Sequence, residues 1–330
     1  MTEPEPLLSV RHLTTLFEVN RKTYACALED VSFDVYPYQT VGLVGESGCG
    51  KSTTLLSILR LLPPNARLSG QVFFKGVDLL SLSEQQMRAY RWKELALIFQ
   101  SAMNALNPVL RVDEQILEAI LLHRLMPREQ ARQRVHELLD LVGIAPQRGR
   151  QYPFQFSGGM RQRAMIAMAL ACSPSLLFAD EPTTALDVMI QAQVLELLKD
   201  IQKKLGLAIV LVTHDLGVVA ELCDQVVVLY GGKVVESGSV DQIYNSPQHP
   251  YTQKLLESFP DLHHPSSTLA SIPGTPPRLT ELPPGCRFEP RCFARFDRCR
   301  HEAPPLRQVA EKHYAACHLL EGKSPNAGSI

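Results

Sequence analysis

Along the first 80 residues, apolar and polar positions alternate in short runs that end at turns, which is the pattern of β-strands. We predict strands at Leu7–Leu13, Thr14–Val19, Ala27–Tyr36 and Val41–Val44, and one more hairpin limb at residues 68–80. The amino-terminal part of the chain is therefore expected to be rich in β-structure.

The apolar spacing becomes helical from residue 112 to about residue 170. Four residues at positions i, i+3, i+4 and i+7 form one face of a helix: Val135, Leu138, Leu139 and Val142. Gly143 follows them at the place where a helix commonly ends on a glycine. This part of the chain is expected to be a helical insert.

Short apolar runs that are typical of buried strands occur at Leu95–Phe99, Leu176–Ala179, Leu207–Val212 and Val226–Tyr230. A helical pattern over Gln191–Leu205 lies between the second and third of these runs. Strands that alternate with helices predict an α/β fold with a mostly parallel central sheet.

The character of the sequence changes after about residue 255. Eleven of the 24 prolines and four of the eight cysteines lie in residues 256–330. Periodicity is poor there, and Pro273–Pro277 has the composition of irregular chain. We expect a separate carboxy-terminal extension.

Composition and charge narrow the class of protein. Apolar residues make up 45% of the 330 positions, and 33 basic residues face 34 acidic ones, so the net charge is −1. No basic tract indicates nucleic acid, the acidic start Met1–Pro6 is unlike a secretory signal, and no apolar run approaches the length of a membrane span. We expect a soluble chain in the cytoplasm, with cysteines that serve the core, a metal or redox chemistry rather than disulfides.

Residues 45–53 match G-x-x-x-x-G-K-[ST], the loop that wraps a nucleotide polyphosphate. Gly48 and Gly50 allow backbone amides to approach the anionic oxygens, Lys51 would reach the β- and γ-phosphates, and the Ser52 hydroxyl would bind Mg²⁺. A buried strand precedes the loop and a helical pattern follows it, which places a helix N-terminus at the phosphates. The sequence therefore predicts a nucleoside triphosphate site, with these contacting residues: Gly45, Glu46, Ser47, Gly48, Cys49, Gly50, Lys51, Ser52 and Thr53.

Three further segments carry polar groups at the ends of predicted strands or helices. Asp180 and Glu181 end an apolar strand, where one carboxylate can hold Mg²⁺ and its neighbour can polarise an attacking water. Ser157–Gly159 precedes a helix that we expect over Arg161–Ala171, so its amides could bind a second anion. His214 follows Leu207–Val212 at the carboxyl edge of a parallel strand, where ligand sites of α/β proteins form.

Taken in order, these motifs resemble those of ABC-transporter ATPase subunits from residue 7 to about residue 240. The residues that carry the resemblance are Gly45–Ser52, Gln100, Phe156–Gln162, Phe178–Glu181, Thr184–Asp187 and Thr213–Asp215. The signature begins Phe-Ser-Gly-Gly-Met, where Leu-Ser-Gly-Gly-Gln is commonest, but the anion-binding Ser-Gly-Gly core is intact.

The resemblance implies that two cassettes pack head to tail, with ATP between the P-loop of one and the Ser-Gly-Gly stretch of the other. Tyr24 would then stack on adenine, and Gln100 would contact Mg²⁺ and the attacking water and link the site to the membrane subunits. Ser157, Gly158 and Gly159 would clamp the partner's γ-phosphate. Asp187 would cross the interface, and His214 would hold the γ-phosphate.

Two stretches point to one branch of the family. Leu97–Pro108 and His249–Leu256 resemble importers of dipeptides, oligopeptides, nickel and other small solutes, and so does Pro273–Pro277. The branch implies a cassette at residues 1–255, with a helical subdomain at roughly 101–170 and an antiparallel β subdomain, and an extension at 256–330. It also implies a second homologous ATPase subunit, two transmembrane permeases and, indirectly, an extracytoplasmic solute-binding protein, at the cytoplasmic face of the membrane. Peptide import is the function expected.

The extension holds four cysteines at wide spacing: Cys286, Cys292, Cys299 and Cys317. The resemblance to peptide importers implies a [4Fe–4S] cluster, which takes four thiolates. Zinc and no metal at all remain alternatives, because spacing alone does not fix the metal. The other possible ligands are His301, His313 and His318.

The remaining cysteines have simpler interpretations. Cys49 lies in the P-loop near a helix N-terminus, where a thiol pKa can fall, but it is expected to be a neutral filler since no second thiol is adjacent to it. Cys26, Cys172 and Cys223 lie in apolar elements and are expected to be structural.

Two other functions compete with transport. A soluble ABC ATPase acting on DNA or ribosomes would usually need a long coiled-coil insert or a second cassette, and neither is found in this sequence. A redox-sensing regulatory ATPase would lose activity on oxidation and would co-purify with no permease.

Overall fold

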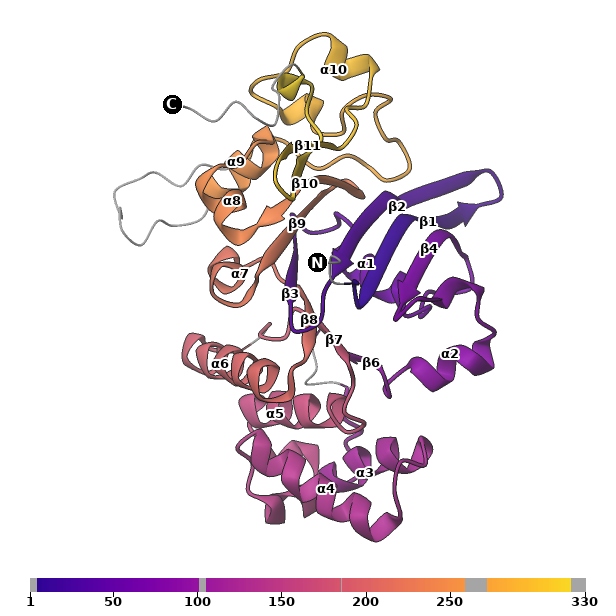
Figure 1. The fold of residues 1–330 in the computed structure, drawn as a ribbon, viewed down its shortest axis with the longest axis vertical. Coiled ribbons are helices and arrows are strands. Elements are labelled where there is room, and N and C mark those ends of the chain that lie inside the picture. Colours follow the sequence, from indigo (N-terminus) through magenta and orange to yellow (C-terminus); the bar gives the residue numbers. More distant parts are fainter. Residues whose placement is uncertain (1–4, 101–104, 185, 259–271, 322–330) are drawn as a thin grey trace. The chain divides into compact units, whose positions relative to one another are not determined.

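The computed structural model describes residues 5–100, 105–184, 186–258 and 272–321. The chain divides into two compact units. The first consists of Met1–Val35, Val41–Leu80 and Thr213–Ile330, and the second of Tyr36–Thr40 and Ser81–Val212. Figure 1 shows the elements of both.

An antiparallel sheet in the first unit has the strand order β2-β1-β4-β5. Its strands are β1 (Leu8–Asn20), β2 (Thr23–Val35), β4 (Ala66–Phe74) and β5 (Val77–Asp78). The prediction of two separate strands at Leu7–Leu13 and Thr14–Val19 was wrong, because β1 is continuous. Register shifts on both sides of Leu13 and a positive φ at His12 absorb the polar interruption, so pairing with β2 and β4 continues through it.

A second set of strands in the first unit includes β3 (Thr40–Val44), β9 (Gln225–Tyr230) and β10 (Lys233–Ser239). β3 runs parallel to β9, and β9 is antiparallel to β10. The helices of this unit include α1 (Lys51–Ile58), α7 (Leu216–Leu222), α8 (Val240–Asn245) and α9 (Pro250–Glu257), and a 3₁₀ turn covers Leu79–Ser81.

The carboxy-terminal residues are more regular than their composition predicts. They form β11 (Arg307–Ala310), β12 (His313–Ala315), α10 (Arg298–His301) and 3₁₀ turns at Glu289–Arg291 and His318–Leu320. β12 pairs with β10 and β11 pairs with β12, so both strands extend the sheet of the cassette (Figure 1). The expectation of irregular chain was wrong for these strands, which have too few residues to show a period of their own.

Phe288 anchors the carboxy-terminal extension (the tail) in the hydrophobic core of the first unit. Its side chain is fully buried and packs edge-on against Tyr230 and Tyr251, at ring-centroid distances of 5.2 and 5.3 Å. The same core contains Val44 of β3 and Leu216 of α7. Burying a phenylalanine side chain stabilises a fold by roughly 1.5–3 kcal/mol, so the tail is part of the folded cassette.

Three parallel strands form the sheet of the second unit: β6 (Leu95–Ile98), β7 (Leu176–Asp180) and β8 (Ala208–Val212). All five residues of β7 and all five of β8 are buried, as expected for parallel strands. These elements and the parallel β3–β9 pair of the first unit confirm the α/β prediction.

The helices of the second unit are α2 (Glu84–Tyr90), α3 (Val112–Leu122), α4 (Arg128–Leu141), α5 (Gly158–Ala169) and α6 (Val188–Leu205), with 3₁₀ turns at Pro146–Arg150 and Pro153–Gln155. α3, α4 and α5 pack together (Figure 1). The predicted face of α4 is confirmed, since its three residues and Val142 are buried, and Gly143 has a φ of +72°. α5 begins at Gly158 rather than Arg161, because Ser157 caps it.

Candidate nucleotide-binding site

The P-loop connects β3 to α1 within the first unit. Its three glycines, Gly45, Gly48 and Gly50, all have positive φ. A Cβ at Gly45 would lie 2.2 Å from the Leu229 carbonyl oxygen, whereas a Cβ at Gly48 would meet nothing within 4 Å. Glycine is therefore required at Gly45 both because a side chain would collide with the backbone and because φ is positive. At Gly48 only the positive φ requires glycine, and the open space around it lets a ligand approach the backbone.

Lys51 places its ammonium group against the backbone of the same loop. Nζ donates hydrogen bonds to the carbonyl oxygens of Gly45, at 2.7 Å, and Glu46, at 3.0 Å. The side chain is buried. A cation at the N-terminus of α1 adds to the partial positive charge of the helix, so the loop is suited to a polyphosphate.

Cys49 is buried under this loop, with its sulfur 3.8 Å from the Lys51 ammonium nitrogen. Burial raises the pKa of the Cys49 thiol above its ordinary value, and the opposing effect of Lys51 is smaller. The thiol is therefore neutral near pH 7, as a filler residue would be.

In the second unit, Glu181 follows β7 directly and has a φ of +45°. Its Oε2 accepts hydrogen bonds from the Gln100 side-chain amide at 2.8 Å and from the Thr184 hydroxyl at 2.9 Å. Left-handed backbone is costly for a residue with a side chain, and such strain concentrates at functional sites. Asp180, the last residue of β7, is buried.

The two other predicted segments of the second unit act locally as helix caps. The Ser157 hydroxyl accepts from the Met160 amide at 3.3 Å at the start of α5, and Asp187 accepts from the Ile190 amide at 3.0 Å at the start of α6. A Cβ at Gly159 would lie 2.6 Å from the Ile190 side chain, so only glycine fits there. Capping alone explains Ser157 and Asp187, and their roles toward a second cassette stay predictions.

Tyr24 and His214 belong to the first unit. The guanidinium carbon of Arg67 on β4 lies 4.7 Å from the centre of the Tyr24 ring on β2, a cation–π contact between the two strands that flank β1. His214 is exposed and precedes Asp215, which caps α7 by accepting from the amides of Gly217 and Val218.

The structure therefore gathers the predicted residues in two groups. The P-loop, Tyr24 and His214 lie in the first unit, and Gln100, Asp180, Glu181, Ser157–Gly159 and Asp187 lie in the second. Within the second unit, Gln100 and Glu181 are brought together across 81 positions of sequence. Ser101–Asn104, in the stretch after Gln100, and Ala185, between Thr184 and Asp187, lie outside the described residues.

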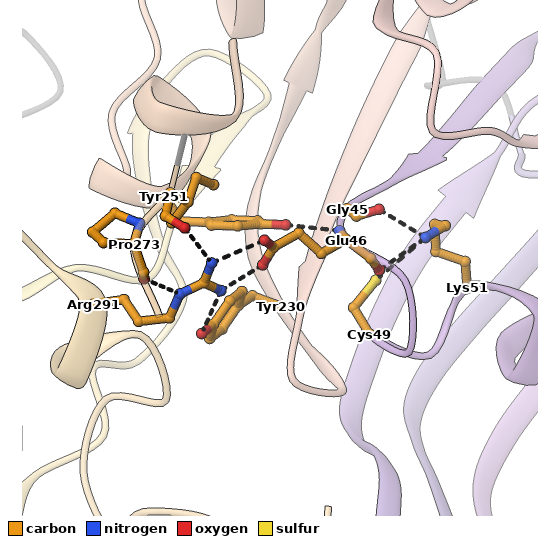
Figure 2. A network of polar contacts seen from close by, with 9 residues as sticks. Gly45, Glu46, Cys49, Lys51, Tyr230, Tyr251, Pro273 and Arg291 are labelled. Atoms are coloured by element: carbon orange, nitrogen blue, oxygen red, sulfur yellow. Dashed lines mark hydrogen bonds and ion pairs between the residues drawn. The ribbon is translucent and has the colours of Figure 1, made fainter. Parts of the chain in front are cut away.

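Sequence reasoning missed two residues that hold the P-loop. Arg291 forms a bidentate ion pair with Glu46, with nitrogen–oxygen distances of 2.6 and 2.9 Å, and the Tyr251 hydroxyl accepts from the Glu46 amide at 2.8 Å (Figure 2). No local pattern could reveal contacts across 245 and 205 positions. Tyr251 does lie in His249–Leu256, a stretch that resembles peptide importers, and that was the available signal.

The four cysteines of the tail line one small cavity of about 10 Å³, together with His249 and His318. Burial, with smaller contributions from the three other tail sulfurs, raises the pKa of the Cys286 thiol to about 11. Within the described ranges, however, no group of three or more His, Cys, Asp or Glu side chains is arranged to hold a metal ion. The described side chains therefore form no ready metal site, and the iron–sulfur cluster stays a prediction.

Two of the three alternative histidine ligands, His313 and His318, are within hydrogen-bond distance of groups other than the cysteines. His313 Nε2 lies 2.8 Å from Glu236 Oε1, His318 Nε2 lies 3.0 Å from the Glu302 carbonyl oxygen, and His301 lies 4.0 Å from Asp297. All eight cysteines lie in described parts of the chain, and each is a free thiol. Burial raises the pKa values of three others, as expected for structural residues: Cys26, Cys172 and Cys223.

The donors predicted for Mg²⁺ are oxygen atoms of Ser52, Asp180 and Gln100, and such hard oxygen ligands suit this ion. A P-loop after a parallel strand, with a second strand that ends in Asp-Glu, defines the class of P-loop nucleotide hydrolases. Comparison with known proteins narrows the class. Residues 28–184 match the family described as ABC transporter, and residues 235–299 match that described as oligopeptide/dipeptide transporter, C-terminal region.

Relatives match along nearly the whole chain. The sequence is 48% identical to the dipeptide transport ATP-binding protein DppD of Bacillus subtilis, over 98% of this chain and 97% of that one. It is 46% identical to the oligopeptide transport ATP-binding protein OppD of the same organism, over 97% and 90%. A dimeric structure of the ATP-binding cassette MJ0796 with ADP and Pi superposes with a TM-score of 0.63 and 28% identity, over 71% of this chain and 98% of that one.

The chain belongs to the ABC transporter family, as one of its ATP-binding subunits. It is therefore an ATPase, and ABC ATPases use Mg²⁺ with their nucleotide. The prediction of an ABC cassette fold is confirmed by the structural neighbours. In the part of the chain that the structure describes, no helix has the length and apolar character to cross a membrane.

Proposed function

We propose that this chain hydrolyses MgATP to power the import of dipeptides, oligopeptides or a related small solute through an ABC transporter. The observation that carries the proposal is that similarity to peptide-transport proteins continues past the cassette, through residues 235–299. A generic cassette would match over the ATPase region alone. The cassette of residues 1–255 and its extension at 256–330 act as one subunit at the cytoplasmic face of the membrane.

The predicted side chains would have different roles in hydrolysis. Lys51 and Ser52 of the P-loop would hold the phosphates and Mg²⁺, and Asp180 at the end of β7 would hold Mg²⁺. Bound Mg²⁺ would neutralise charge on the phosphates. Glu181 polarises the attacking water, and its hydrogen bonds to Gln100 and Thr184 fix the direction of the carboxylate. His214 orients the γ-phosphate and Tyr24 contacts the adenine.

A second homologous cassette completes each nucleotide site in this proposal. The N-terminus of α5, with Ser157–Gly159, offers amides to the γ-phosphate bound by the partner, and Asp187 lies at the interface. Val188 and Met189, which follow Asp187, are 82% and 74% exposed, and exposed apolar side chains of this kind are common at protein–protein interfaces. Gln100 passes the motion to two permeases, which receive solute from an external binding protein.

The decisive experiment compares Glu181→Gln with wild type in the transporter reconstituted with its permeases. We expect ATP turnover and peptide uptake to fall together by about 10²–10³-fold, while MgATP binding persists, since general-base groups contribute about 10²–10⁴-fold. Glu196→Gln, at an exposed position of α6, is the matched control. If ATP turnover stays intact in Glu181→Gln, the assignment of Glu181 is wrong. If the wild-type transporter hydrolyses ATP but takes up no peptide, the assignment of the cargo is wrong.

The four-cysteine tail is proposed as the site of a [4Fe–4S] cluster. What supports this is that all four sulfurs line one cavity, although no ready single-ion site exists among the described side chains. Anaerobic purification, with iron, sulfide and zinc analysis beside a Cys286→Ser/Cys292→Ser variant, tests it. About four irons and four sulfides per chain, lost in the variant, is the expected result; zinc, or neither metal, contradicts it.

A further inference from the structure

Glu46, the second residue of the P-loop, is held through three different groups. Its amide donates to the Tyr251 hydroxyl, its carboxylate pairs with Arg291, and its carbonyl accepts from the Lys51 ammonium at 3.0 Å (Figure 2). The phosphate-binding lysine and the tail arginine are thus joined through one residue. The position of the Lys51 ammonium depends on where Glu46 is held.

Arg291 is a fixed anchor rather than a mobile partner. Its side chain is 5% exposed, and it donates to the carbonyl oxygens of Pro273, at 2.8 Å, and Ile272, at 3.2 Å, and to the Tyr230 hydroxyl, at 3.2 Å. Because several of its N–H groups are already hydrogen-bonded, the guanidinium group cannot turn, and a carboxylate can form a bidentate pair with it in only one position. The P-loop must therefore adapt to the arginine.

Tyr251 is held in place by a second network that also involves the tail. Its amide donates to His249 Nδ1 at 3.0 Å, and the buried Glu236 carboxylate accepts from the His249 amide at 2.8 Å and contacts His313 of β12 at 2.8 Å. Residues of the tail therefore support both contacts to Glu46, one directly and one through α9.

Charge gives this arrangement a function. The Glu46 carboxylate sits on a loop built for a triphosphate, and an uncompensated negative charge there would repel the ligand. Arg291 neutralises this charge by its ion pair. The Glu46 side chain is only 26% exposed, so solvent would screen its charge incompletely if the arginine were absent.

We propose that Arg291 is a positioning residue of the nucleotide site, through which the carboxy-terminal tail sets the affinity of the P-loop for MgATP. The inference rests on the proposed ATPase function. It assigns the tail a role in nucleotide binding that is independent of whether its cysteines hold a metal.

The experiment measures the Kd of MgATP for the full chain by titration calorimetry in Arg291→Gln, Glu46→Gln and the double variant. We expect Arg291→Gln to raise the Kd about tenfold, through the unpaired carboxylate. The double variant should bind more tightly than Arg291→Gln, because removing the Glu46 charge removes the repulsion. A merely structural role would change the denaturation midpoints of these variants and leave the Kd unchanged.

Two further variants make the outcome decisive. Tyr251→Phe deletes only the hydroxyl that holds the Glu46 amide and should raise the Kd about threefold, with a similar kcat. Arg298→Gln breaks an ion pair to Glu302 inside the tail and should leave the Kd unchanged.

Wild-type affinity in Arg291→Gln, a double variant as weak as Arg291→Gln, or an equal loss in Arg298→Gln would each overturn the proposal. Failure of the wild type itself to bind MgATP would instead overturn the proposed function.

Discussion

The P-loop and the Glu181 site are held in different ways. Arg291 and Tyr251, buried residues from the far end of the sequence, fix Glu46 in the P-loop, and Phe288 packs beside them in a hydrophobic core. Glu181 is oriented by Gln100, an exposed side chain, and by Thr184, three positions away in sequence. Buried contacts resist local opening, whereas exposed ones break more easily.

The contrast fits the tasks proposed for the two regions. The P-loop must keep its shape to bind phosphates, and a rigid setting lowers the reorganisation needed when charge is bound. The Gln100 segment is proposed to transmit motion to permeases, so its contacts must break and form again in each cycle.

Lys51→Ala removes the cation at the centre of the rigid site. We expect ATP turnover to fall about 10³-fold, because a fixed charge that stabilises transferring phosphate is worth about 10²–10³-fold. Steady-state phosphate release measures this. Lys199→Ala on α6 is the control, and turnover within tenfold of wild type would contradict the placement of Lys51.

Phe288→Ala tests whether the tail is part of the core of the cassette. The variant should lose about 3–5 kcal/mol of stability, as buried phenylalanines do on truncation, and should bind MgATP less tightly as its fold weakens. Chemical denaturation measures the loss. Phe293→Ala, whose ring is 60% exposed, serves as the control. Equal, small losses in the two variants would show that the tail adds little to the core.

Acidification should loosen the support of Tyr251. Burial lowers the pKa of His249 to about 4. Because the unfolded chain takes up this proton near pH 6.5 and the folded chain does not, stability is present above pH 6.5 and is lost as pH falls from 6.5 toward 4. The loss reaches about 3 kcal/mol at about 1.4 kcal/mol per pH unit.

Denaturation midpoints between pH 7 and pH 4.5 measure this effect, and His249→Asn, which can still cap α9, should flatten the profile. The neighbouring Glu236 and His313 are the other titratable groups of the network. An unchanged slope in His249→Asn would assign the pH dependence to them.

Gln100→Ala and Thr184→Ala address the exposed site with the smallest expected effect. Each should lower kcat about tenfold with an unchanged Kd for MgATP, because each removes one hydrogen bond that orients Glu181. Single-turnover hydrolysis measures the step. A loss of MgATP affinity comparable to that of Arg291→Gln would remove the distinction between the two regions.

Local signals in the sequence were sufficient for much of the fold. The periodicity of α4, the buried runs of β6 to β9 and the glycine pattern of the P-loop are each encoded within a few neighbouring residues. The continuity of β1 through His12 and the pairing of β12 with β10 depend on partners that lie elsewhere in the chain. The contacts of Arg291 and Tyr251 to Glu46 are the extreme case, because no local feature of either residue indicates that Glu46 is its partner.

The Arg291–Glu46 pair also has a consequence for synthesis. The ribosome makes Glu46 early and Arg291 some 245 residues later, which at about 5–20 residues per second is a delay of roughly 12–50 seconds. During that time the nascent chain carries its phosphate loop without the arginine that holds it. The ATP site is therefore among the first parts of the protein to be translated and among the last to be completed.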